Sequence, residues 1–318
     1  DEDRSRCSPS DMDFWVSGPK ADFLSVFDGP SGTLNAHAIG AGLVAMPPID
    51  LVAAKPSDVL GDIDFSLHML GIIKRRPTFV MFAPTCGPWS TLAVLNKNKP
   101  GFTAKVEAER AIQLRVLRRM GLMIRVILGQ GGHVMIENPS HCLLWSLPEM
   151  QRLRAIPGST WTEFTMDQCM IGGRHRKPTR FWTTAPAACS RDMHLKCNHA
   201  EKHPLCTGRD PDGVSRSSKA AVYPQELCAS IIRVAHRVAK LKGQGQTDTA
   251  DSAADTVINS TVQVDVGACS ALNNSNSTVR DRFPKAFSCA PGPSHLWHHP
   301  SEITVPVRVT DYDASVEE

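Results

Sequence analysis

The sequence lacks any apolar run long enough to cross a lipid bilayer, and it lacks a basic segment followed by an apolar one at its start. These two absences argue against a membrane-spanning chain and against a secretory leader. No internal repeat is present. The ten cysteines have irregular spacings rather than the pattern of a disulfide-rich secreted domain. We therefore expect reduced thiols and a location in the nucleus or the cytoplasm.

Charge is distributed unevenly along the chain. Residues 74–242 contain 27 Lys and Arg against 11 Asp and Glu, whereas residues 1–73 contain 4 against 11 and residues 243–318 contain 4 against 10. A basic middle segment predicts a polyanionic partner such as nucleic acid. The alternative is a solvated helix face, because "RAIQLRVLRRMGLMIR" places arginines around an apolar stripe.

A chain of 318 residues with 42% hydrophobic content can bury a full core. It begins with Asp1 rather than Met, so we expect a piece of a longer polypeptide. After residue 243 the composition becomes polar and rich in small residues, which is typical of disorder. The predicted organisation is an N-terminal extension (1–20), a domain (21–242) with a short Cys/His-rich insertion (185–220), and a disordered tail (243–318).

Buried-strand patterns alternate with helical ones along the domain. The longest helical pattern covers residues 104–128, and a second one begins near Pro224. This alternation predicts an α/β fold with a mostly parallel, doubly wound sheet covered on both faces. The predicted strands are "DFLSVF", "LVAMPPIDLV", "TFVMFA", "GGHVMIENP", "TEFTMD" and "RFWTT".

Three short motifs follow the first strands. The glycine-rich turn Phe27–Gly32 can bring a backbone close to a ligand at a helix N-terminus. It is not a phosphate-binding P-loop, because no Gly-Lys-Ser/Thr follows it. Asp50 ends the second strand, where a ribose hydroxyl is a suitable donor, and Asp62 stands beside Ile63 in "GDID". The alternatives are a structural turn, a helix cap and a plain loop, respectively.

The stretch "FAPTCGPWS" breaks a buried strand and leaves a lone thiol, Cys86, at the break. In open α/β sheets the carboxyl edge is where ligands bind, so Cys86 is either a reactive thiol or a small apolar filler. The later strand "GGHVMIENP" is broken by Asn138 and Pro139, directly after Glu137.

The ordered set of these motifs resembles the cytosine-C5 methyltransferase family, over residues 20–184 and the helix from Tyr223. The resemblance implies a Rossmann-like sheet that binds S-adenosylmethionine, with DNA as the favoured substrate and RNA as the alternative. It makes Cys86 the nucleophile and Glu137 the proton donor, with Asn138 beside it. A later arginine motif has a loose echo in "GRHRKPTRF", where Arg176, Lys177 and Arg180 compete for its roles. It also implies a cofactor site formed by Phe27, Asp28, Gly29, Gly32, Asp50, Asp62, Ile63 and Pro84.

The sequence departs from the family at Thr85 and Gly87 around the cysteine and at Pro139 after Glu-Asn. Only about forty residues stand where the family has a large target-recognition segment, a low-end length for an independent module. These departures resemble methyltransferase-like domains of retroelement polyproteins. The alternatives are therefore a catalytically weak nucleic-acid-binding module of that kind and, third, a Cys-His hydrolase that uses Cys86.

The segment "CNHAEKHPLC" brings together two Cys and two His within ten residues. Such a set can bind zinc in a tetrahedron. The alternative is surface histidines and buried thiols, while Cys142, Cys169 and Cys228 have contexts typical of packing. The predicted zinc ligands are Cys197, His199, His203 and Cys206.

Overall fold

The computed structural model describes residues 13, 15–29, 32–50, 60–91, 98–244, 264–265 and 308–309. The chain divides into two units, Phe14–Thr249 and a second unit of Asp1–Asp13 with Ala250–Glu318. In the second unit, β6 (Val264–Asp265) and β7 (Arg308–Val309) pair antiparallel. Residues 243–244 of the tail for which we predict disorder belong to helix α8 (Gln225–Gln244), and the rest of it, apart from β6 and β7, lies outside the described residues.

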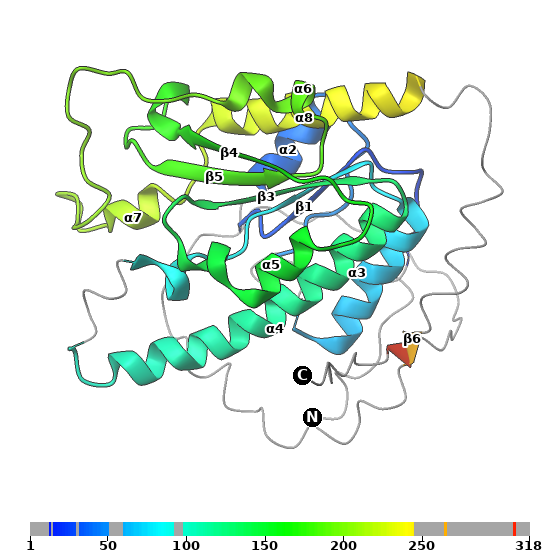
Figure 1. Cartoon of the computed structure of the whole chain (residues 1–318), viewed down its shortest axis with the longest axis horizontal. Helices are drawn as coiled ribbons and strands as arrows, with labels where there is room; N and C mark the ends of the chain where they lie inside the picture. The colour runs from blue at the N-terminus through cyan, green and yellow to red at the C-terminus, as the bar shows by residue number, and fades with distance from the viewer. Residues whose placement is uncertain are drawn as a thin grey trace, which may run out of the picture. The chain divides into compact units, whose positions relative to one another are not determined.

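The larger unit contains a five-stranded sheet in the order β1-β2-β3-β5-β4 (Figure 1). Strands β1, β2 and β3 are parallel, whereas β5 is antiparallel to both of its neighbours. On the outer side of β1, Ala45 and Ile49 form isolated parallel bridges to that strand and extend the sheet. The strands are β1 (Phe23–Val26), β2 (Phe79–Phe82), β3 (His133–Pro139), β4 (Thr162–Asp167) and β5 (Pro178–Thr183).

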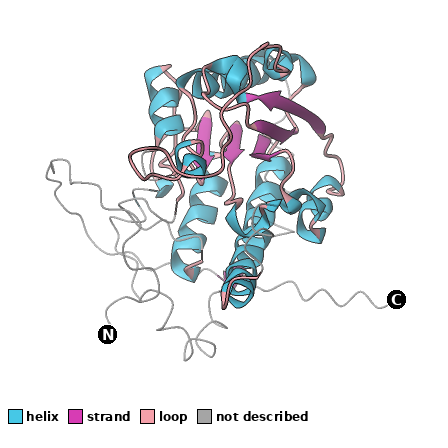
Figure 2. Ribbon diagram, turned by 90° about the vertical axis from the view of Figure 1, so that its left-hand side faces the viewer, coloured by secondary structure: helices cyan, strands magenta, loops and turns pink. Residues whose placement is uncertain are grey.

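Helices cover both faces of the sheet (Figure 2). Helices α2 and α8 lie on one face together with α6, and α3, α4 and α5 lie on the other (Figure 1). Strands β1 and β2 are buried along their whole length between these layers, which is why they read as mainly apolar runs rather than alternating ones. The helices are α2 (Thr33–Gly40), α3 (Asp62–Arg75), α4 (Phe102–Gly129), α5 (Pro148–Arg154), α6 (Ala187–Ser190), α7 (Arg216–Lys219) and α8 (Gln225–Gln244).

The core on the α2 and α8 face is built from alternate residues of the strands. Phe23, Phe79, Met81, Met135 and Phe181 are at most 1% exposed and pack in one cluster with both helices. Successive strand residues point to opposite faces, so the residues between them contact the α3, α4 and α5 layer. The face on which a side chain lies can therefore be assigned residue by residue.

The mixed α/β fold is confirmed, with three differences from the sequence prediction. The strand expected over "LVAMPPIDLV" forms only the isolated bridges of Ala45 and Ile49 within the described residues, because Pro47 and Pro48 have no N–H for a ladder. Helix α3 was not among the predicted elements, although Phe65, Met69 and Ile72 recur at helical spacing and are buried. Strand β5 reverses direction inside a sheet that we expected to be mostly parallel. The connection from β4 is short, and such a connection joins antiparallel strands rather than parallel ones.

The predicted N-terminal extension is partly packed on the domain. Trp15 is 1% exposed, and its ring centroid lies 4.5 Å from that of His68 in α3. The guanidinium of Arg75 donates from Nε to the carbonyl oxygen of Pro19 at 3.2 Å. The ordered unit thus includes residues before 21. Among the helices of the described segments, none combines the length and apolar character needed to span a bilayer.

The order of the strands creates a switch point between β1 and β2. From β1 the chain crosses outward to the bridges at Ala45 and Ile49, and it then returns to β2 on the opposite side of β1. Open α/β sheets bind ligands outside the carboxyl ends of the strands at such a point. The carboxyl edge near β1 and β2 is therefore where a ligand site is expected.

Candidate active site

Four of the predicted site residues follow strand ends at one edge of the sheet. Phe27 follows β1 directly, and Asp50 follows Ile49, which bridges in parallel to Val26. Cys86 lies four residues after the end of β2, and Glu137 comes one residue after Ile136, which pairs in parallel with Phe82. Since these strands are parallel, all four residues lie at the carboxyl edge.

Asp62 reaches the same edge through α3. The last turn of this helix lies at the amino edge, because the carbonyl of Arg75 accepts a hydrogen bond from the N–H of Ala21 at 2.8 Å, just before β1. Fourteen residues of helix extend about 21 Å, so its first residue lies near the opposite edge. There Asp62 forms an ion pair with Arg119 of α4. The side chain of Ile63 is outside the described residues.

The loop that presents Cys86 is fixed on both sides. Before the cysteine, Asn138 donates from Nδ2 to the carbonyl of Pro84 at 2.6 Å in a buried contact. After it, the short helix η2 (Gly87–Trp89) packs on α4, where Arg110 donates to the carbonyl of Pro88 at 3.1 Å and stacks over the Trp89 ring at 5.2 Å. Cys86 itself is half-buried, so the loop holds the thiol in place without enclosing it.

The surroundings of Cys86 act on its pKa in opposite directions. Burial raises the pKa of the thiol above its ordinary value, the negative charge of Glu137 raises it further, and the positive charge of Lys177 lowers it. The net effect is a raised pKa, so the resting group is a thiol rather than a thiolate. Among the described residues, no imidazole is hydrogen-bonded to Cys86, which leaves the hydrolase alternative without its base.

Glu137 is held from one side only. Glu137 is 5% exposed, and its Oε2 accepts a hydrogen bond from the hydroxyl of Tyr223 at 2.6 Å. The other oxygen, Oε1, is buried and has no hydrogen-bond partner among the described residues. Burial and the nearby Glu137 charge hold the pKa of Tyr223 well above its usual value, so the phenol remains a donor. An unpartnered buried carboxylate oxygen is a place for a ligand donor.

Tyr223 is a site residue that sequence reasoning did not single out. It stands 86 positions after Glu137, just before α8, and no motif marks it. Its signal was compositional at best, since the chain has only two tyrosines. Helix α8 brings it onto the face of the sheet where Glu137 lies.

Lys177, rather than Arg176 or Arg180, acts on Cys86, because its positive charge lowers the pKa of the thiol. Its backbone has φ 31°, a left-handed conformation that is rare for a residue with a side chain and that clusters at functional sites. Its Nζ donates to the carbonyl of Ala220 at 2.9 Å and lies 6.0 Å from the centroid of the Tyr223 ring. The ammonium group is thereby aimed at this edge.

The two arginines lie elsewhere. Arg180 pairs in register with Asn138, so it projects from the face opposite to Glu137, where its Nε lies 3.5 Å from Glu163. Arg176 places its Nε 3.3 Å from the buried carboxylate of Asp167. The structure thus gives both arginines ion-pair partners away from Cys86, and their catalytic roles stay predictions.

The glycine-rich turn after β1 is organised by two carboxylates. Asp28 accepts from the N–H groups of Leu34 and Asn35 at 3.1 and 3.0 Å, which caps the start of α2. Burial raises the pKa of Asp28 despite these bonds. Asp50 accepts from the N–H of Gly29 at 2.6 Å. Asp28 is therefore committed to a structural contact, in addition to any role toward a ligand.

Backbone conformation sets this turn apart. Phe27 has φ 68°, an outlier for a bulky side chain, and Gly29 has φ 81°. A Cβ built on Gly29 would meet no atom of the described residues within 4 Å. Gly32 has φ 54° at the start of α2. Residues 30–31 and 51–59 are outside the described part of the chain.

A second cluster of reactive side chains lies away from Cys86. The ligand atoms of Cys169, Cys197, His199 and His203 all lie within 4.8 Å of one another, and together they could hold a metal ion. Cys206, the fourth predicted ligand, is not in this group. Cys169, for which the sequence indicates packing, takes its place, because the turn after β4 brings it against the 195–206 segment.

A groove of ≈ 540 Å³ lies between α2 and α8, on the outer surface of that helix layer. His37 and Ala41 line one side, and Arg233 and His236 line the other. Neither Cys86 nor any other residue of the carboxyl edge takes part in it.

Comparison with known proteins adds no family to these observations. No protein-family model matches the chain, and no curated protein matches its sequence. The interpretation of the site therefore depends on its residues and their geometry.

Proposed function

We propose that the chain is an S-adenosylmethionine-dependent methyltransferase acting on carbon 5 of cytosine in nucleic acid, with DNA favoured over RNA. The observation that carries the proposal is the meeting of Cys86 and Glu137 at one edge of the sheet. They arrive there from the ends of two adjacent parallel strands, and the negative charge of Glu137 raises the pKa of the Cys86 thiol. A thiol beside a carboxylate with one unpartnered oxygen suits the chemistry of this reaction.

The thiolate of Cys86 would form a bond to carbon 6 of cytosine. The electron pair of the carbon 5 to carbon 6 double bond is then displaced into the ring, which makes carbon 5 nucleophilic. Glu137 would hold a proton on ring nitrogen 3 and so neutralise the charge that develops there. Once carbon 5 carries the methyl group that the bound cofactor would supply, its proton would pass to a water molecule. The electron pair left behind would re-form the carbon 5 to carbon 6 double bond, and the sulfur to carbon 6 bond would break to restore the thiolate. A base inside a duplex cannot reach such a site, so the nucleotide must be flipped out.

Two further residues support these steps. Tyr223 fixes the carboxyl group through Oε2, which leaves Oε1 for the base. Lys177 favours the thiolate of Cys86, because its positive charge lowers the pKa of the thiol. Proton removal from the thiol is the demanding step, because the net pKa is raised.

The backbone of Gly29, which has no described atom within 4 Å of a Cβ built on it, and the buried Asp50 carboxylate bonded to its N–H fit a bound nucleoside cofactor. Phe27, Gly29, Gly32 and Asp50 would hold S-adenosylmethionine there, and Asp62 would stand at the edge of the same region. When bound, the cofactor supplies the methyl group. The switch point between β1 and β2, with helices on both faces, supports a Rossmann-like arrangement for this binding.

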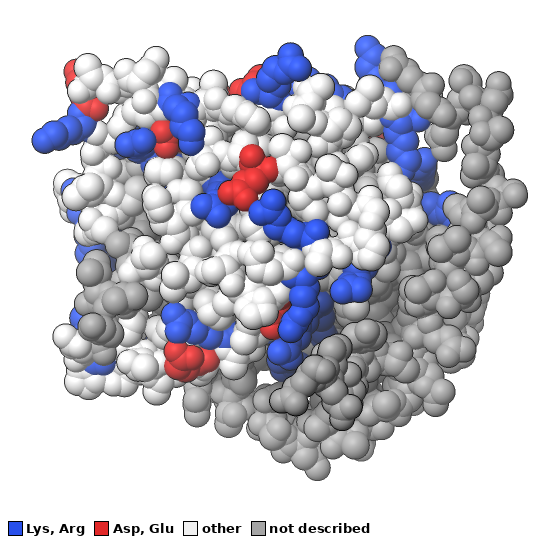
Figure 3. Space-filling view, viewed as in Figure 1, with Lys and Arg blue, Asp and Glu red and all other residues white. Residues whose placement is uncertain are grey.

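A second candidate is a catalytically weak, nucleic-acid-binding module of a retroelement polyprotein. The raised pKa of Cys86 favours it, since no described base is bonded to the thiol. For either candidate, the basic charge is divided among several groups on the face shown in Figure 3, rather than forming one stripe. Many Lys and Arg side chains of the basic segment 74–242 also form ion pairs, as Arg154 and Arg180 do with Glu163.

Methyl transfer from labelled S-adenosylmethionine to mixed DNA and RNA separates the two candidates. The enzyme incorporates label, and it stays covalently attached to an oligonucleotide that carries 5-fluorocytosine, because fluorine cannot leave carbon 5 as a proton does. Cys86→Ser must abolish both signals while the protein folds normally. Cys142→Ser is the matched control, since this buried thiol lies near Cys86 and has a pKa raised to about 12. Label transfer by the Cys86→Ser variant at the wild-type rate would sink the proposal.

A further inference from the structure

We propose that Cys169, Cys197, His199 and His203 form a structural zinc site that fixes residues 195–206 against the turn after β4. The four ligand atoms lie within 4.8 Å of one another. The Cys197 sulfur lies 3.4 Å from His199 Nδ1 and 3.1 Å from His203 Nε2. In a zinc tetrahedron with ordinary bond lengths, sulfur and nitrogen ligands are about 3.6 Å apart. The Cys197 sulfur and the two imidazole nitrogens are already at nearly this spacing.

The donor set selects the class of metal. Two thiols and two imidazoles are the ligands of structural zinc, whereas calcium and magnesium require oxygen ligands. Four protein ligands fill the tetrahedron and leave no position for a water or a substrate. The site is therefore structural rather than catalytic. This proposal is independent of methyl transfer by Cys86.

The backbone holds the ligands in place before any metal binds. Asp167, which is 1% exposed, donates from its N–H to the carbonyl of Leu195 and accepts at Oδ2 from the N–H of Cys197, both at 2.9 Å. Cys169 follows two residues later in η5 (Gln168–Ile171). One buried carboxylate thus brings the two cysteine-bearing segments together. Such outer partners of metal ligands orient them and strengthen binding.

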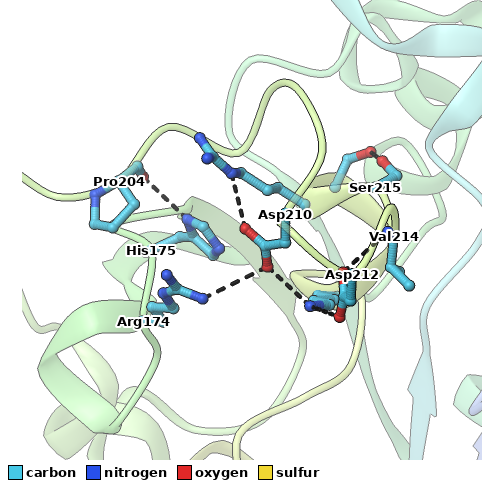
Figure 4. A network of polar contacts seen from close by, with 10 residues as sticks. Arg174, His175, Pro204, Asp210, Asp212, Val214 and Ser215 are labelled. Atoms are coloured by element: carbon cyan, nitrogen blue, oxygen red, sulfur yellow. Dashed lines mark hydrogen bonds and ion pairs between the residues drawn. The ribbon is translucent and has the colours of Figure 1, made fainter.

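The far end of the segment is also tied to the same connection. His175, between β4 and β5, lies with Nδ1 3.0 Å from the carbonyl of Pro204 (Figure 4). Asp167 and His175 thereby anchor the segment at both ends. The remaining cluster residues, His199 and His203, lie between these two anchors.

Between its anchors the segment has little else to hold it. No side chain of residues 196–206 is buried, and among the described residues no main-chain group of 196–207 is bonded to another main-chain group. The next stretch of chain differs, because buried Asp210 binds Arg216 and Lys219 at 2.9 Å and Arg174 at 3.5 Å (Figure 4). A segment without a core of its own requires a cross-link, and a metal ion supplies one.

The test begins with the full chain, purified under reducing conditions without chelator. Elemental analysis should find one zinc per chain, and cobalt(II) in its place should give the visible absorption of a tetrahedral ion with thiolate ligands. His199→Gln, at an exposed position, should weaken zinc binding at least tenfold without unfolding the protein. Asp167→Asn should weaken it about 10- to 100-fold by disturbing the ligand backbone.

Matched cysteine variants identify the ligand set. Cys169→Ser should lose the cobalt spectrum, while Cys206→Ser, on the same segment, should keep it. The opposite pattern would assign the site to Cys206 and overturn the proposal. The proposal would also be overturned if the full chain bound neither zinc nor cobalt. A third contrary result is a disulfide between Cys169 and Cys197 in protein purified without reductant, together with no bound metal in protein purified with reductant.

Discussion

Replacing Tyr223 with phenylalanine removes a single hydroxyl from the candidate site. That hydroxyl donates to Glu137 Oε2 at 2.6 Å, and Glu137 Oε1 already has no partner among the described residues. The ring contacts with the core around α8 would be kept, because Phe has the same shape. The variant therefore leaves a buried carboxylate without any described hydrogen bond. We expect the free energy of unfolding to fall.

The size of the effect follows from the charge of the acceptor. A hydrogen bond to a charged group contributes about 1.5–3 kcal/mol, whereas a bond between neutral groups contributes about 0.5–1.5 kcal/mol. Tyr223→Phe should cost the larger amount in the wild-type protein and the smaller amount in a Glu137→Gln background, where the acceptor is neutral. With a urea dependence of roughly 1–3 kcal/mol per molar, the wild-type midpoint should shift by about 1 M.

Urea unfolding of the four proteins in this cycle measures the difference directly. Ser146→Ala provides a control, because its hydroxyl makes an exposed bond to the carbonyl of Leu143 at 2.9 Å and should contribute little. If Tyr223→Phe costs the same in both backgrounds within about 0.5 kcal/mol, the two side chains are not coupled. The assignment of Tyr223 as the residue that positions Glu137 would then be wrong. In the 5-fluorocytosine assay, the variant should also trap more slowly.

Two further predictions concern the same edge of the sheet, and a third concerns the basic segment 74–242. Alkylation of Cys86 by iodoacetamide should accelerate as the pH rises toward the raised pKa of the thiol. At a fixed pH, Glu137→Gln should make the alkylation faster and Lys177→Met should make it slower. Equal rates in the variants and the wild type would contradict the charge argument. Asn138→Ala removes the donor to a buried carbonyl before the cysteine and should lower the free energy of unfolding by about 1–3 kcal/mol, measured in urea, with an unchanged midpoint as the contrary result. Affinity for mixed-sequence DNA should fall steeply with salt if residues 74–242 contact phosphates, and a flat salt dependence in a filter-binding titration would remove that argument.

The sequence alone determined the elements that depend on local pattern. The bounds expected for β4 agree with the structure, and those of α4 and β3 agree to within two residues, because each is a distinct periodic run. The position of Cys86 after one buried strand and of Glu137 at the end of another also follows from the sequence. Parallel strands end at the same edge of a sheet, so the alternation of strands and helices was enough to predict the edge that these two residues share.

Tertiary structure decided which residues join them. The fold distinguished three sets of residues that the sequence did not. Lys177, rather than Arg176 or Arg180, acts on the Cys86 thiol, and Tyr223, rather than any motif residue, holds Glu137. In the metal cluster, Cys169 rather than Cys206 joins Cys197. Each depends on contacts between segments far apart in the chain, which a local pattern does not encode. The reversed strand β5 makes most of these choices, because its insertion beside β3 fixes which side chains of the β4 to β5 connection reach each face of the sheet.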